Sequence, residues 1–198
     1  MFENELKKEI DFLLDKATLL EVKEIENDLA TVFNKVTTEN EISSQIKEAV
    51  FYILSELSDN VKQHSKASKS WILYNKDKGN IIILLADNGI GIPAVFDRYF
   101  PDLDKNDLEK VREALEKGVS TKGEGRGYGL RTVRGIVEAT AAEMVFISGG
   151  VGYKITKNKK DPLEIDVAGT ITLIKIPVDA RLDSSQFYKI IEGRNERN

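Results

Sequence analysis

The sequence contains no cysteine and only one histidine among its 198 residues. The absence of cysteine excludes disulfide bonds and thiolate metal sites, and a single histidine excludes a metal site built from several histidines. A Mg²⁺ ion prefers oxygen ligands and needs neither residue type. Magnesium is therefore the metal ion that this composition leaves open.

An excess of positive charge is also missing, because 29 lysines and arginines stand against 33 aspartates and glutamates, a net charge of -4. Nucleic-acid binding depends strongly on cationic contacts to phosphates, so we do not expect it here. No apolar run approaches the roughly 20 residues that span a bilayer, and the charged N-terminus lacks the apolar core of a signal peptide. We expect a cytoplasmic protein that binds neither nucleic acid nor membrane.

Length and composition fit a single domain, because 41% hydrophobic residues in 198 are ample for one continuous core. We expect an N-terminal helical extension over residues 1–18, the main domain over residues 19–180 and a C-terminal tail over residues 181–198.

Apolar residues at three- and four-residue spacing predict helices. These helices cover residues 2–16, 19–36, a long stretch that starts at 37–40 with an apolar stripe from 46 to 61, and 131–142. Strands are predicted over residues 70–74, 80–86, 144–148, 153–156 and 169–176, with a hairpin turn at 76–79 and a polar hairpin loop at 158–161. The second strand is apolar on both faces and should be central. The order of elements predicts an α/β, two-layer sandwich of helices on a mixed, mostly antiparallel sheet.

Glu56 and Asn60 lie four residues apart on the long predicted helix, so they share one face with Tyr52 and Gln63 nearby. An amide oxygen can coordinate Mg²⁺, and a carboxylate can orient or deprotonate a nucleophile that attacks a γ-phosphate. The alternative is an ordinary solvated polar face. We interpret the single histidine, His64, as a structural or site-bordering residue and not as a phosphoacceptor.

Asp87 directly follows the apolar second strand, where a carboxylate is unfavourable unless something donates hydrogen bonds to it. The exocyclic amine of adenine could be that donor, and Gly89 and Gly91 would let the backbone approach the base closely. The alternative is a glycine-rich turn in which Asp87 binds only its own backbone.

A charged segment between Pro93 and Gly123 includes a predicted helix over residues 107–117, and we expect it to be a lid. Four glycines then alternate with larger residues before a helix, which presents backbone N–H groups and the positive end of the helix dipole to an anion such as a phosphate. The alternative for the glycine stretch is a flexible linker, and the alternative for the charged side chains beside it is simple exposure to solvent. The candidate nucleotide-binding residues are Lys122, Gly125, Arg126, Gly127, Gly129 and Leu130 in this region, and Thr170 on the last strand.

Taken in order, these stretches resemble the motifs of the GHKL ATPase superfamily, which groups gyrase, heat-shock chaperone, histidine kinase and MutL nucleotide-binding domains. Residues 56–60 resemble its N box, residues 87–91 its G1 box, residues 123–130 its G2 box, and residues 169–170 its closing strand. The resemblance implies that ATP binds between lid and sheet, with Glu56 as catalytic base, Asn60 as magnesium ligand and Asp87 as the residue that recognises adenine.

Within the superfamily, residues 60–65 look closest to stand-alone anti-sigma-factor-type serine kinases. We therefore expect an ATP- and Mg²⁺-dependent enzyme that transfers the γ-phosphoryl group to a serine or threonine of a regulatory partner protein, or hydrolyses ATP. Self-phosphorylation on histidine is not expected, because the single histidine already lies within the N-box stretch. A gyrase-like machine is not expected either, because only about twenty residues follow Pro177. The alternative is a non-catalytic binding module whose lid is ordered by ATP. A homodimer is left open.

Overall fold

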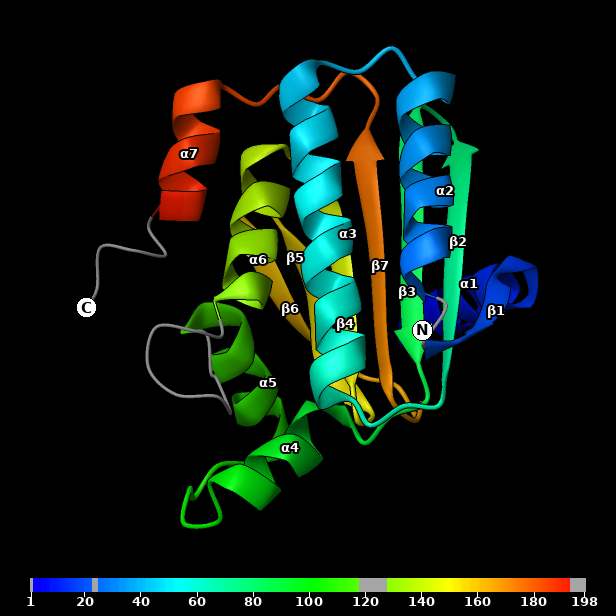
Figure 1. Cartoon of the computed structure of the whole chain (residues 1–198). Coiled ribbons are helices and arrows are strands. Elements are labelled where there is room, and N and C mark those ends of the chain that lie inside the picture. Colours follow the sequence, from blue (N-terminus) through cyan, green and yellow to red (C-terminus); the bar gives the residue numbers. More distant parts are fainter. Residues whose placement is uncertain (1, 23–24, 118–127, 193–198) are drawn as a thin grey trace.

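The computed structural model describes residues 2–22, 25–117 and 128–192, which form helices packed on one sheet (Figure 1). The helices are α1 (Phe2–Lys16), α2 (Ile25–Glu39), α3 (Ser44–His64), α4 (Gly91–Tyr99), α5 (Asp107–Glu116), α6 (Gly129–Ala139) and α7 (Ser184–Glu192). The strands are β1 (Thr18–Glu21), β2 (Lys69–Asp77), β3 (Asn80–Asp87), β4 (Glu143–Ser148), β5 (Val151–Thr156), β6 (Lys159–Glu164) and β7 (Thr170–Pro177). Within these residues, no helix is long and apolar enough to cross a membrane.

The seven strands form one sheet in the order β1-β2-β3-β7-β4-β5-β6, and each neighbouring pair is antiparallel. The predicted α/β sandwich is thereby confirmed. Strand β3 lies inside the sheet, between β2 and β7, and its residues from Ile81 to Asp87 are buried. Such a strand needs apolar side chains on both faces, because both faces of the sheet are covered.

Helices α2, α3 and α6 cover one face of the sheet (Figure 1). The apolar stripe of α3, which includes Ile46, Val50, Ile53 and Val61, is buried in the core between these helices and the sheet. Ser43 begins α3 as its N-cap, since its hydroxyl accepts a hydrogen bond from the Ile46 N–H at 3.3 Å. The stripe fixes which face of α3 points away from the core.

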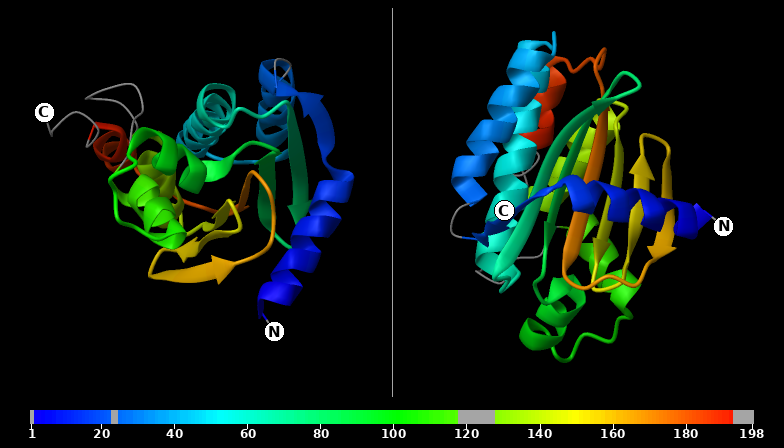
Figure 2. Two further views of the ribbon diagram at one scale, coloured as in Figure 1. Left: turned by 90° about the horizontal axis from the view of Figure 1, so that it is seen from below. Right: turned by 90° about the vertical axis from the view of Figure 1, so that its right-hand side faces the viewer.

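Helix α1 covers the opposite face of the sheet (Figure 2). Leu6, Ile10 and Leu13 are buried there against apolar side chains of β3, β4 and β7. An ion pair of 2.7 Å joins Glu9 on α1 to Lys175 on β7. This helix therefore completes a second apolar core on the outer side of the sheet.

Two predicted boundaries near the N-terminus are wrong. Residues 18–21 form an edge strand paired with β2, whereas a helix was predicted to start at residue 19. Residues 37–40 do not start a helix, because α2 continues to Glu39. The hydroxyl of Thr37 donates to the Phe33 carbonyl at 3.0 Å, and that of Thr38 donates to the Asn34 carbonyl at 2.7 Å. Both hydroxyls therefore bind carbonyls within α2, and neither caps the start of α3.

Three further elements were not predicted. Strand β6 occupies most of the expected polar loop at 158–161, and it is polar because it is a sheet edge that contains lysines and Pro162. Helix α4 lies in the segment expected to be a lid. Helix α7 lies in the expected tail, where it buries Phe187 and packs on α6 at Gly135; a Cβ there would lie 3.0 Å from Cγ2 of Ile190.

Candidate functional site

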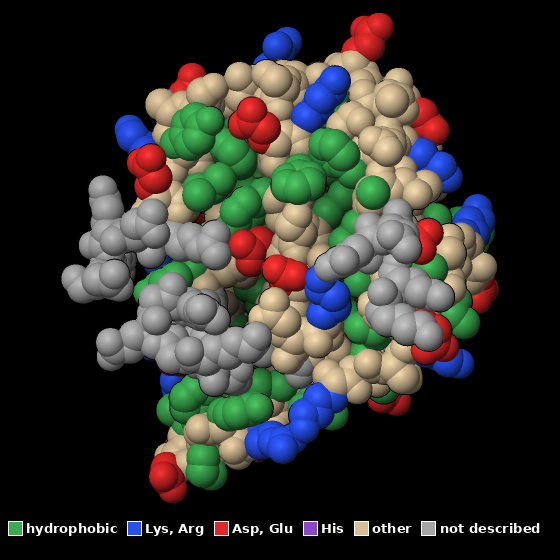
Figure 3. Space-filling view, viewed as in Figure 1, with side chains coloured by type: hydrophobic (Ala, Val, Ile, Leu, Met, Phe, Trp, Pro, Cys, Tyr) green, Lys and Arg blue, Asp and Glu red, His purple; other side chains and the backbone are tan. Residues whose placement is uncertain are grey.

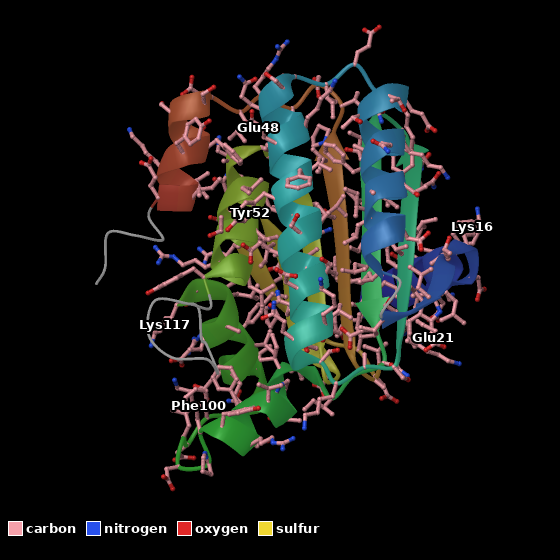
Figure 4. All side chains as sticks on the ribbon, viewed as in Figure 1. Lys16, Glu21, Glu48, Tyr52, Phe100 and Lys117 are labelled. Atoms are coloured by element: carbon pink, nitrogen blue, oxygen red, sulfur yellow. The ribbon has the colours of Figure 1, made fainter. Side chains whose placement is uncertain are left out.

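Helix α3 places Glu56 beside the start of α6. A Cβ added to Gly129, the first residue of α6, would overlap the Glu56 carboxylate, so this carboxylate lies against the backbone at the start of α6. Figure 4 shows Tyr52, one turn before Glu56, on the side of α3 that faces α6. The predicted polar face of this helix is thus turned toward α6 and away from the sheet core.

Asn60 lies one turn after Glu56 on the same face of α3. Its side-chain nitrogen is buried and has no hydrogen-bond partner in the described part of the chain. A buried amide group without a partner is unfavourable, and a group from outside the chain could supply the missing partner. A phosphate oxygen could accept from the nitrogen, and a cation could bind the oxygen if the amide were turned over.

Asp87 ends strand β3 and is only 5% exposed. Its carboxylate accepts a hydrogen bond from the Gly89 N–H at 2.7 Å and further bonds from the backbone and hydroxyl of Thr170. Burial nevertheless dominates and raises the pKa of Asp87 to about 6, while the hydrogen bonds from Gly89 and Thr170 act in the opposite direction. A carboxylate has about four acceptor positions, so three internal donors leave room for another.

A chain of hydrogen bonds holds Asp87 in place from the neighbouring strands. The Ile92 N–H donates to the Ser148 hydroxyl at 2.8 Å, and this hydroxyl lies 2.9 Å from the hydroxyl of Thr170. Either hydroxyl of this pair can be the donor. The network thus joins the ends of β3, β7 and β4 to the first turn of α4.

The glycines near Asp87 allow close backbone packing. A Cβ on Gly89 would overlap the carbonyl oxygen of Ser65, which follows α3, and a Cβ on Gly169 would overlap that of Asp87. Gly91 has a φ of +75° and packs against Gly149. The structure therefore gives these glycines a role in joining the C-terminal end of α3 to the ends of β3 and β7.

The structure brings predicted site residues together in two groups. Glu56 lies against Gly129, with Asn60 one turn further along α3, and Asp87 lies beside Thr170 across the β3–β7 pair. Gly89 and Gly91 lie in the connecting backbone, and the side chain of Leu130 packs against the main core. The other predicted residues, Lys122, Gly125, Arg126 and Gly127, lie outside the described residues. Sequence reasoning missed Ser148, whose only local sign is its place at a strand end before two glycines.

The raised pKa of Asp87 predicts a pH-dependent stability of the free protein. Between about pH 4 and pH 6 the folded state holds a proton on Asp87 that the unfolded chain has released, so the free energy of unfolding falls as the pH rises through this window. A shift of about two units corresponds to about 3 kcal/mol. The free energy of unfolding of Asp87→Asn, measured relative to wild type, should therefore increase by roughly this amount as the pH rises from 4 to 7.

Urea unfolding of both proteins across this range measures the difference directly, and the comparison cancels the contribution of the other carboxylates. A difference in stability that is constant with pH would show that Asp87 is ionised in the free protein throughout.

The chain is similar to known proteins both in a family model and among solved structures. A family model described as histidine kinase-, DNA gyrase B- and HSP90-like ATPase matches residues 45–179. Among solved structures, the catalytic domain of histidine kinase ThkA is 14% identical, with a TM-score of 0.41, and the match covers 81% of this chain and 95% of that one. The mycobacterial sensor histidine kinase MprB is 15% identical, with a TM-score of 0.43 and coverages of 84% and 99%.

No curated protein matches the chain. The family match nevertheless covers more than half of the sequence and includes Glu56, Asn60, Asp87 and Thr170. The predicted superfamily is confirmed, and the chain belongs to the family of histidine kinase-, DNA gyrase B- and HSP90-like ATPases.

Proposed function

We propose that this site binds Mg-ATP and transfers the γ-phosphoryl group to a serine or threonine hydroxyl of a regulatory protein, or to water when no partner is bound. The observation that carries this proposal is the contact between Glu56 and the start of α6. In the described part of the chain Tyr128, the N-cap of α6, makes no side-chain cap hydrogen bond, and we propose that the N–H groups of the first turn bind an anion. A phosphate there would lie next to the Glu56 carboxylate.

In this role Glu56 acts as a general base. It would accept the proton of the attacking hydroxyl or water, whose oxygen forms the new bond to phosphorus while the bond to the β-phosphate oxygen breaks. Lys122, Arg126 and the amide groups of Gly125 and Gly127 are proposed to contact the phosphates, as the loop composition suggests. A bound Mg²⁺ ion would supply the remaining charge compensation.

Asn60 is the residue proposed to hold Mg²⁺ together with the nucleotide phosphates. The described residues contain no group of three or more acidic or histidine side chains that could hold a metal ion by themselves. Mg²⁺ commonly binds through one or two protein oxygens, phosphate oxygens and water, which fits a single amide ligand. When bound, the ion would neutralise negative charge on the transferred phosphoryl group.

Asp87 is proposed to select adenine. Its buried carboxylate can accept from the exocyclic amine of adenine, whereas guanine would present a carbonyl oxygen to the same acceptor and repel it. The hydroxyl of Thr170 lies beside it. Hydrogen bonds to charged groups contribute about 1.5–3 kcal/mol, so Asp87→Asn should weaken ATP binding roughly tenfold to a hundredfold.

Isothermal titration calorimetry with Mg-ATP and Mg-GTP tests this function. We expect micromolar binding of ATP, much weaker binding of GTP, and a loss of the preference in Asp87→Asn. Asp77→Asn, at the exposed β2–β3 turn, is the matched control and should bind ATP like wild type. Equal affinities for ATP and GTP in the wild-type protein would contradict the assignment.

A further inference from the structure

The exposed side of α3 carries a row of four residues at four-residue spacing: Lys47, Phe51, Ser55 and Asp59. Phe51 is 59% exposed, the highest value among the exposed large hydrophobic side chains of the described residues. Figure 3 shows hydrophobic side chains gathered on the face formed by α2 and α3. We call these four residues the α3 ridge.

A groove beside Phe51 has a volume of about 370 Å³. It lies between α2 and α3, and its apolar walls include Leu29, Phe33 and Leu54. The rings of Phe33 and Phe51 are 5.5 Å apart in an edge-to-face arrangement. The face therefore offers both a protruding aromatic side chain and an apolar groove next to it, a combination that marks an interaction surface.

The order of residues along the ridge is self-complementary. If a second α3 ran antiparallel over the first with the two-fold axis at Ile53, Lys47 would face Asp59 of the other copy, and Phe51 would face Ser55. Each pair joins opposite charges or a large side chain with a small one. Lys47 has no ion-pair partner among the described residues of its own chain, and Asp59 has only an exposed partner, Lys62, at 3.3 Å. Exposed pairs of this kind are weak, so Asp59 can exchange its partner at little loss.

We propose that two copies of this chain associate through the α3 ridge as a two-fold symmetric dimer, with α2 of each copy flanking the contact. Each pair of contacting residues then occurs twice, once on either side of the axis, as two-fold symmetry requires. The four helices would form a bundle in which Phe51 enters the groove of the other copy.

The size of this face fits a weak dimer. The 21 residues of α3 span about 31 Å, and two packed helices are roughly 20 Å wide, which gives roughly 600 Å² per copy. Stable interfaces bury about 800 Å² per partner, so association in the micromolar range is expected. Glu56 lies about 140° around the helix from Phe51, because successive residues turn by about 100°. The nucleotide site stays open in the dimer, and this proposal is independent of the proposed function.

Sedimentation equilibrium of the full chain across micromolar concentrations tests the dimer. Wild type should be a monomer–dimer mixture, and Phe51→Asp should raise the dissociation constant at least about a hundredfold, as expected for a central aromatic contact. Phe12→Asp removes an equally exposed ring on α1, 55% against 59%, and should leave the constant unchanged. A wild-type protein that is monomeric at every concentration would overturn the proposal. A dimer that forms equally well in Phe51→Asp would also overturn it.

A charge exchange tests the antiparallel register. Lys47→Glu places two acidic pairs in the interface and Asp59→Lys places two basic pairs there, so each single variant should weaken the dimer about tenfold. The double variant Lys47→Glu, Asp59→Lys restores both pairs and should regain most of the wild-type affinity. A double variant whose loss equals the product of the single losses would overturn this register.

Discussion

Replacing Glu56 with glutamine should lower ATP turnover by about 10²–10⁴-fold while the dissociation constant for ATP changes by less than about threefold. Glutamine keeps the size of the side chain beside Gly129 but cannot accept a proton from the attacking oxygen. The nucleotide itself is held by other groups, so ground-state binding should persist. Single-turnover hydrolysis measures the rate, and calorimetry measures the affinity.

Glu48→Gln is the matched control for this variant. Glu48 is exposed near the N-terminal end of the same helix, more than two turns before Glu56 (Figure 4). The same chemical change there should leave both turnover and affinity at wild-type values. If Glu56→Gln binds ATP and turns it over like wild type, the phosphotransfer mechanism is wrong, and the non-catalytic binding module becomes the better description.

Elements with a strong local pattern could be predicted from the sequence. The β2–β3 hairpin is marked by its turn residues, and the central place of β3 follows from apolar residues on both of its faces. Helix α3 is marked by its apolar stripe. Strand β6 and helix α7 could not be found in the same way, because an edge strand and a short surface helix bury few residues and leave a weak period.

In the candidate site, too, features set by local geometry could be predicted, and features set by strand pairing could not. Glu56 and Asn60 share a helix face through local geometry, which spacing alone predicts. Thr170 lies beside Asp87 because β7 pairs with β3 in that register, and Ser148 joins them because β4 pairs with the other side of β7. No local pattern fixes these strand pairings, so the family resemblance could suggest Thr170, but Ser148 was visible only in the folded chain.

Helix α1 was predicted correctly as a helix, yet its partner surface was not. Its stripe of Leu6, Ile10 and Leu13 predicts that one face of the helix is buried, but it does not predict which surface of the domain covers that face. In the structure that face covers apolar residues of β3, β4 and β7. We therefore propose that α1 belongs to the folded domain, although the family model begins only at residue 45.

Ile10→Asp should accordingly lower the free energy of unfolding by at least about 4 kcal/mol, because it removes a fully buried side chain and buries a charge in its place. Phe12→Asp introduces the same residue two positions away on the exposed side of α1, where it removes only a ring contacted by the Lys16 ammonium at 3.9 Å, and should change stability by at most about 1 kcal/mol. Urea unfolding at one pH compares the two variants.

Equal, small effects would mean that α1 is a dispensable extension and that the domain can be cut at residue 18 without loss. A large effect of Ile10→Asp alone would instead mean that the outer core is part of the cooperative unit that holds β3 and β7, and with them Asp87 and Thr170, in register.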